Sequence, residues 1–145
     1  MACFSCTGTN EGVAGKLANV TGADLYEIVP AEPYTARDLD YGGRSNRATC
    51  EQDHPDTRPK LGGKSLSLKG YTRLYLGYPI WWDMESRVLC TFVESYDFTG
   101  VTVIPFCTSG SDLAKLVGTG KWLDGARHSG AVSESALREW VESLK

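Results

Sequence analysis

The sequence has no long apolar run, only two histidines and no excess of positive charge. Its most apolar stretch, residues 74–82, is interrupted by Gly77 and Pro79 and is much shorter than the roughly 20 residues of a membrane-spanning helix. The formal net charge of −3 gives no basic field for a polyphosphate backbone, which argues against a general nucleic-acid binder. No charged and apolar leader follows Met1, so we expect a cytoplasmic protein without a secretory signal.

The five cysteines do not form a disulfide framework of the kind found in small secreted domains. Cys90 and Cys107 lie inside apolar runs, where a thiol behaves as a small hydrophobic group. Cys3 and Cys6 form a C-x-x-C pair, but no second Cys/His pair lies near them to suggest zinc, and a redox pair normally opens a helix directly. We therefore expect reduced thiols and no metal site.

Common phosphate-binding and catalytic motifs are also missing. Gly63-Lys64-Ser65 lacks the upstream glycine of a Walker loop, and no G-x-G-x-x-G follows the first apolar segment. No cysteine-phosphatase loop is present, because the required arginine does not follow the candidate cysteines at the right distance. His54 and His128 lack a convincing serine or cysteine elbow, so we expect solvated loop residues and predict no catalytic residue.

The remaining composition is typical of one globular domain over residues 1–145, with 41% hydrophobic and 23% charged residues. Apolar runs typical of strands alternate with segments of helical periodicity. We expect strands at residues 2–4, 25–29, 71–78, 101–106 and, weakly, 122–123. We expect helices at residues 10–20, 47–52, from 88 to before Asp97, 112–117, and near the C-terminus with Ala136, Leu137, Trp140, Val141 and Leu144 on one face. This alternation predicts an α/β fold with an open, doubly wound parallel sheet.

Ligands of such sheets bind at the carboxyl ends of the strands. The segment Ser5-Cys6-Thr7-Gly8-Thr9-Asn10 places hydroxyls, an amide and a glycine at the start of the first helix, where unpaired backbone N–H groups favour an anion. It contains no lysine or arginine, which suits a phosphate monoester held by hydrogen bonds. An ordinary helix N-terminus is the alternative.

Two further segments leave strands with unusual side chains. Pro79-Ile80-Trp81-Trp82-Asp83 carries adjacent indoles, which could form the wall for a flat aromatic ligand or could both be core residues. Thr108-Ser109-Gly110 is a small polar turn whose amides could reach ligand carbonyls.

Four motifs, in order, resemble those of the flavodoxins, in particular short bacterial flavodoxin-like proteins with a Trp-Trp loop. Residues 4–10 resemble the phosphate loop of the family, and residues 76–82 its first ring-binding loop. Residues 92–98 resemble the following helix end, and residues 103–110 the fourth strand and second ring-binding loop. The resemblance covers nearly the whole chain.

The resemblance implies a five-stranded parallel sheet in the order 2-1-3-4-5 with helices on both faces, and non-covalent FMN. It implies that Ser5, Cys6, Thr7, Gly8, Thr9 and Asn10 bind the phosphate. The isoalloxazine would lie between Pro79, Ile80, Trp81, Trp82, Asp83 and, on the other side, Thr108, Ser109, Gly110. The implied function is electron transfer between redox partner proteins, by a monomer or weak homodimer.

Two alternatives remain open. One is a small flavin-dependent NAD(P)H quinone or nitro-compound reductase. The other is a flavodoxin-like domain that no longer binds FMN, since the first strand is short, Asp83 replaces the usual glycine, and the segment after Gly110 is shorter than in the family. A carboxylate at Asp83 would also disfavour an anionic reduced flavin nearby.

Overall fold

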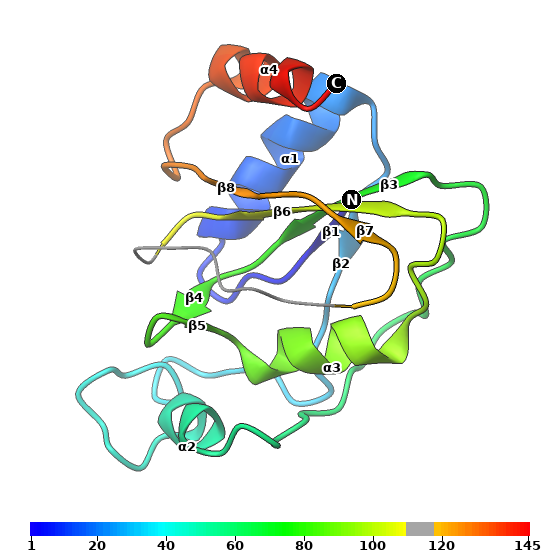
Figure 1. Ribbon diagram of the computed structural model, residues 1–145. Coiled ribbons are helices and arrows are strands. Elements are labelled where there is room, and N and C mark those ends of the chain that lie inside the picture. Colours follow the sequence, from blue (N-terminus) through cyan, green and yellow to red (C-terminus); the bar gives the residue numbers. More distant parts are fainter. Residues whose placement is uncertain (110–117) are drawn as a thin grey trace.

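The middle layer of the fold is a parallel sheet of short strands (Figure 1). The computed structural model describes residues 1–109 and 118–145. The strands of this sheet are β1 (Ala2–Cys3), β2 (Tyr26–Glu27), β3 (Arg73–Gly77), β6 (Thr102–Cys107), β7 (Lys121–Trp122) and β8 (Ala126–Arg127). Their order is β2-β1-β3-β6-β7. On the same side of β6, β7 pairs with its start and β8 pairs with its end. The predicted α/β fold is therefore confirmed, with two short strands sharing the fifth position.

Helices cover both faces of this sheet (Figure 1). They are α1 (Thr9–Thr21), α2 (Arg47–Asp53), α3 (Arg87–Ser95) and α4 (Glu134–Ser143). In Figure 1, α1 and α4 lie on one face, and α3 lies on the other with α2 farther out. The predicted helices at these four places are confirmed, although Ala136 of α4 is exposed and does not belong to its apolar face.

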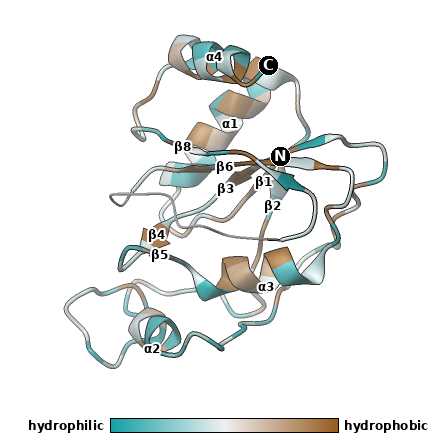
Figure 2. Cartoon of the chain, viewed as in Figure 1, coloured by the Kyte–Doolittle hydropathy of each residue, from teal (hydrophilic) through white to brown (hydrophobic). Residues whose placement is uncertain are grey.

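The hydrophobic core consists of two clusters, one on each face, because side chains of a strand alternate in direction. Ala2 and Leu76 pack toward α3, whereas Cys3 and Tyr75 pack toward α1 and α4. Figure 2 shows the corresponding hydrophobic colour along β3 and on parts of α1 and α3. Gly77 is required at the end of β3, since a Cβ there would overlap the ring of Phe106.

Some local predictions need correction. The predicted loop at residues 79–83 contains the first strand of an antiparallel hairpin, β4 (Ile80–Trp81) and β5 (Met84–Glu85). The short strand β8 was not predicted. The predicted helix at 112–117 lies outside the described residues. No helix in residues 1–109 and 118–145 has the length and apolar character needed to cross a membrane.

Candidate functional site

A cavity of about 390 Å³ lies where the chain leaves the carboxyl ends of β1, β3 and β6. It brings together residues from all three predicted segments and from one segment that was not predicted. It is lined by Cys6, Thr7, Thr9, Asn10, Leu39, Tyr41, Pro79, Trp81, Thr108 and Ser109. Its volume is within the range of small-molecule sites in proteins.

The first wall is the loop that leads into α1. Gly8 has the left-handed conformation at φ 81°, and it forms the N-cap without a side-chain hydrogen bond. Its carbonyl accepts from Gly12 N–H at 2.9 Å, so the helix begins directly after the loop. Because Gly8 has no side chain that could accept from the first-turn N–H groups, this end of α1 is open to an external anion.

Residues 5–9, at the start of α1, carry three hydroxyl groups. Thr7 and Thr9 are exposed, with their Oγ1 atoms 3.5 Å apart. The Ser5 Oγ is buried and has no hydrogen-bond partner within the described part of the chain. Ser5 does not line the large cavity but a second one of about 240 Å³, together with Cys3, Glu11, Leu25, Tyr26 and Glu27.

A side-chain hydrogen bond joins the first loop to the end of β6. Thr108 Oγ1 donates to Asn10 Oδ1 at 3.0 Å, and Asn10 is buried. On the opposite wall, the backbone N–H of Ile80 donates to Ser109 Oγ at 3.4 Å. Thr108 and Ser109 thus contact the two other segments of the site. Gly110, the last predicted site residue, lies outside the described residues.

The two cysteines near the loop are not suited to redox chemistry. Burial raises the pKa of Cys3 and of Cys6 to about 12, so both thiols stay protonated at neutral pH. Both are free thiols, and no cluster of metal-ligating side chains is found among the described residues.

Trp81 forms the floor of the cavity and also belongs to the core. Its ring makes edge contacts with Phe4 and Tyr34, with centroid distances of 5.8 and 5.1 Å. Trp81 is therefore a core residue, as one of the two interpretations of the sequence has it, and it also lines the cavity.

Trp82 has a different environment at the rim. It is half-buried, and its ring lies 4.8 Å from that of Tyr41, which is 65% exposed. Trp82 and Asp83 form the two-residue turn of the β4–β5 hairpin at φ 49° and 59°. Positive φ at both positions is typical of a type I′ turn, which usually carries Asn-Gly, so Trp-Asp is strained there. Ile80, Trp82 and Asp83 flank the cavity but do not line it.

Leu39 and Tyr41 are the lining residues that the sequence did not predict. They lie in the long segment between β2 and β3, which has no apolar periodicity. The signal in the sequence was Tyr41 before Gly42-Gly43, and this pattern by itself indicates only a turn.

The two histidines differ from each other. His54 is exposed as predicted, with Nδ1 2.7 Å from the carbonyl oxygen of Cys50. His128 is not a solvated loop residue: its ring packs edge-on against Trp140 at 4.6 Å. Its Nε2 is buried without a described hydrogen-bond partner, and burial lowers its pKa below 6.5.

Comparisons with known proteins agree with this fold. A family model described as flavodoxin matches residues 1–144. A "putative flavoprotein" from Bacteroides eggerthii DSM 20697 has a crystal structure similar to this fold, with a TM-score of 0.86 and 35% sequence identity over 99% of this chain and 94% of the other. One from Bacteroides uniformis ATCC 8492 has the same TM-score and identity over 97% and 95% of the two chains. No curated protein matches the sequence.

Proposed function

The chain belongs to the flavodoxin family, and on this premise we propose that it binds FMN non-covalently and carries electrons between partner proteins. The observation that carries the proposal is the meeting of three segments, far apart in the sequence, around one cavity of about 390 Å³. Each segment brings a different kind of group: helix N–H groups and hydroxyls, aromatic rings, and a small polar turn.

The FMN phosphate fits the end of the cavity at α1. Gly8 leaves the first-turn N–H groups without a side-chain cap, and Thr7 and Thr9 add hydroxyl donors. No lysine or arginine is present in residues 5–10, so the phosphate would be held by N–H and O–H donors and by the helix dipole.

The flat ring fits the aromatic end. Trp81 supplies an apolar floor, and Tyr41, which packs on Trp82, supplies a side wall. Thr108 and Ser109 lie opposite with polar groups that could meet the polar edge of the ring. The flavin would supply one-electron or two-electron transfer, while the protein excludes water from one side of the ring and sets its electrostatic surroundings.

The proposed partners are redox proteins, a donor and an acceptor. The net charge of −3 suits transient encounters with basic proteins, steered by charge rather than held by a large interface. Binding of this kind would weaken with added salt.

The first test is a visible absorption spectrum of the purified protein, followed by titration of the flavin-free form with FMN. We expect a flavin spectrum and strong quenching of flavin fluorescence, since aromatic side chains line the cavity. A folded protein that takes up no FMN would refute the proposal and favour the degenerate domain. Rapid steady-state turnover of NAD(P)H with a quinone would instead favour the reductase.

A further inference from the structure

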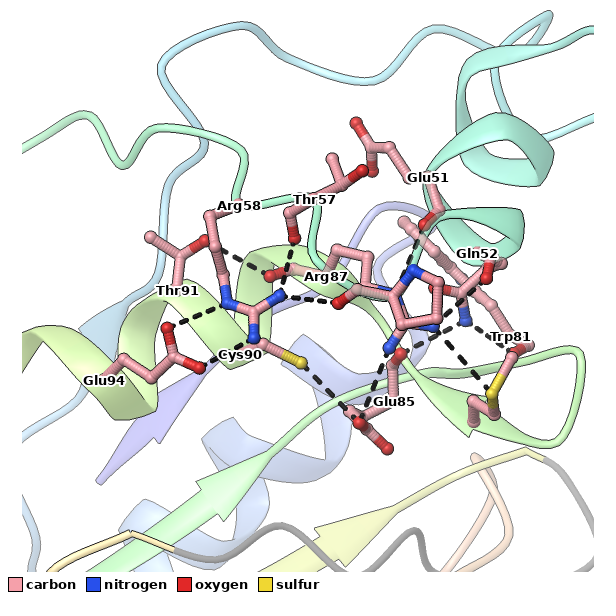
Figure 3. Close-up of polar contacts among 12 residues, drawn as sticks. Glu51, Gln52, Thr57, Arg58, Trp81, Glu85, Arg87, Cys90, Thr91 and Glu94 are labelled. Atoms are coloured by element: carbon pink, nitrogen blue, oxygen red, sulfur yellow. Dashed lines mark hydrogen bonds and ion pairs between the residues drawn. The ribbon is translucent and has the colours of Figure 1, made fainter.

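Side chains of α2 and α3 contact the β4–β5 hairpin (Figure 3). This hairpin carries the strained turn beside the cavity. Gln52, at the end of α2, donates through Nε2 to two carbonyl oxygens of the hairpin. These are Trp81 O at 2.8 Å and Glu85 O at 3.1 Å, one on each strand. A single side chain therefore holds both strands.

Arg87, at the start of α3, joins the same hairpin to α2. Its Nε donates to Glu51 O at 3.2 Å, and its Nη2 donates to Gln52 O at 3.1 Å. On the hairpin side, Nη1 lies 3.7 Å from Glu85 Oε1, and Nη2 lies 3.9 Å from Met84 Sδ. We name these two residues, Gln52 and Arg87, the clamp.

The clamp is buried, in contrast to a neighbouring ion pair. Gln52 and Arg87 are each 4% exposed. Arg58 and Glu94 form a two-point ion pair at 2.8 Å, but their side chains are 35% and 58% exposed (Figure 3). Removing a buried charged donor leaves its partners unsatisfied, whereas an exposed pair contributes little to stability.

The turn next to the clamp has a strained backbone conformation. Trp82 and Asp83 both have positive φ, a conformation that costs bulky and charged residues free energy and persists where surrounding contacts enforce it. The residues on both sides of the turn, Trp81 and Met84, contact the clamp. The clamp itself does not line the cavity, so it can act on a ligand only through the hairpin.

We propose that Gln52 and Arg87 are positioning residues that hold the Trp82–Asp83 turn in its left-handed conformation and thereby set the affinity and the reduction potential of the flavin. This inference rests on the proposed function. It also assigns a function to the irregular segment between β2 and β3, because α2 in this segment carries Gln52, which binds the hairpin.

The test compares four variants of the full chain: Arg87→Met, Arg87→Lys, Gln52→Met and, as the matched control, Arg58→Met. Each flavin-free protein is titrated with oxidised FMN, and the midpoint potential of each loaded protein is measured. We expect Arg87→Met and Gln52→Met to weaken FMN binding about tenfold or more and to shift the potential. Arg87→Lys, which keeps the charge near Glu85 but loses the fork, should recover part of the affinity. Arg58→Met should stay within about twofold of the wild type.

A second measurement needs no flavin. Amide hydrogen exchange of residues 80–85 in the flavin-free protein should be faster in Gln52→Met than in Arg58→Met, because the hairpin loses its support. If Arg87→Met does not fold, Gln52→Met, which removes two donors without removing a charge, decides the question. A wild type that binds FMN, with clamp variants of unchanged affinity, potential and exchange, would overturn this inference alone. A wild type that binds no FMN would overturn both proposals.

Discussion

The hydroxyl of Thr108 donates a hydrogen bond to the side-chain oxygen of Asn10, with 3.0 Å between Oγ1 and Oδ1. This bond joins the end of β6 to the first turn of α1. The two residues are far apart in the sequence, and both line the same cavity. The bond therefore links the proposed phosphate and ring ends of the site.

Loss of this bond should reduce both stability and binding. Thr108→Val leaves the buried Asn10 oxygen without its partner, which costs about 1–3 kcal/mol of unfolding free energy. Urea denaturation measures this loss, and FMN titration should show weaker binding. Ser143→Ala, which removes an exposed hydroxyl on α4, is the control and should change stability by less than about 0.5 kcal/mol. Equal effects of the two variants would contradict the prediction.

The two ends of α1 offer a matched pair of glycines. Gly8 and Gly22 both have positive φ, and neither would meet another atom with an added Cβ. Alanine at either position should therefore cost about 1 kcal/mol of stability through backbone strain alone. Only Gly8→Ala should weaken FMN binding, because Gly8 lies in the loop proposed to hold the phosphate and Gly22 lies at the other end of α1. Cys6→Ser should weaken this binding little, because the backbone N–H groups of the loop and the hydroxyls of Thr7 and Thr9 stay in place. Equal FMN affinity in Gly8→Ala and Gly22→Ala would refute the assignment of this loop to the phosphate.

The charge of Asp83 should lower the flavin potential. Asp83→Asn keeps the size of the side chain and removes a negative charge at the rim of the site, so reduction to an anionic flavin becomes easier. We expect a rise of the midpoint potential on the order of 20 mV, measured by equilibration with a reference dye. The rise should shrink at high salt, since Asp83 is exposed. A lowered potential would contradict this charge effect.

Stability should decrease as the pH falls below about 6.5, because of His128. Burial lowers the pKa of His128 below its ordinary value of 6.5. Between these two pKa values the unfolded chain binds a proton that the folded chain does not, so acid favours unfolding. His128→Phe keeps a ring against Trp140 and should flatten this part of the pH profile, measured by urea denaturation from pH 5 to 8. An unchanged slope would show that other groups cause it.

Gly77 should tolerate no side chain. A Cβ would overlap the Phe106 ring in a filled core, so Gly77→Ala should cost about 1–3 kcal/mol, measured by thermal or urea unfolding. Gly12→Ala, in the exposed face of α1 with open space around it, should instead stabilise the protein by about 0.5–1 kcal/mol. Opposite signs are expected, and destabilisation by both substitutions would contradict the prediction.

Most of the fold was predictable because its signals are local. Nearly continuous apolar runs mark β3 and β6, and periodic apolar residues mark α1 and α3. The hairpin was not predictable, because Trp82 and Asp83 are unusual residues for its turn and neighbouring groups enforce their conformation. His128 was assigned to solvent for a similar reason: its burial depends on Trp140 of α4, which is near it only in the folded chain.

For the candidate site, the groups at the three strand ends could be predicted from residue type: the hydroxyls and glycine of residues 5–10, the paired indoles and the polar turn. These follow from residue type and from the rule that parallel strands present their carboxyl ends together. The folded chain was needed to find that Leu39 and Tyr41 complete the cavity and that Gln52 and Arg87 contact the hairpin. Those residues come from an irregular segment or from a neighbouring helix. No local pattern encodes which distant groups they meet, because their contacts depend on the path of the whole chain.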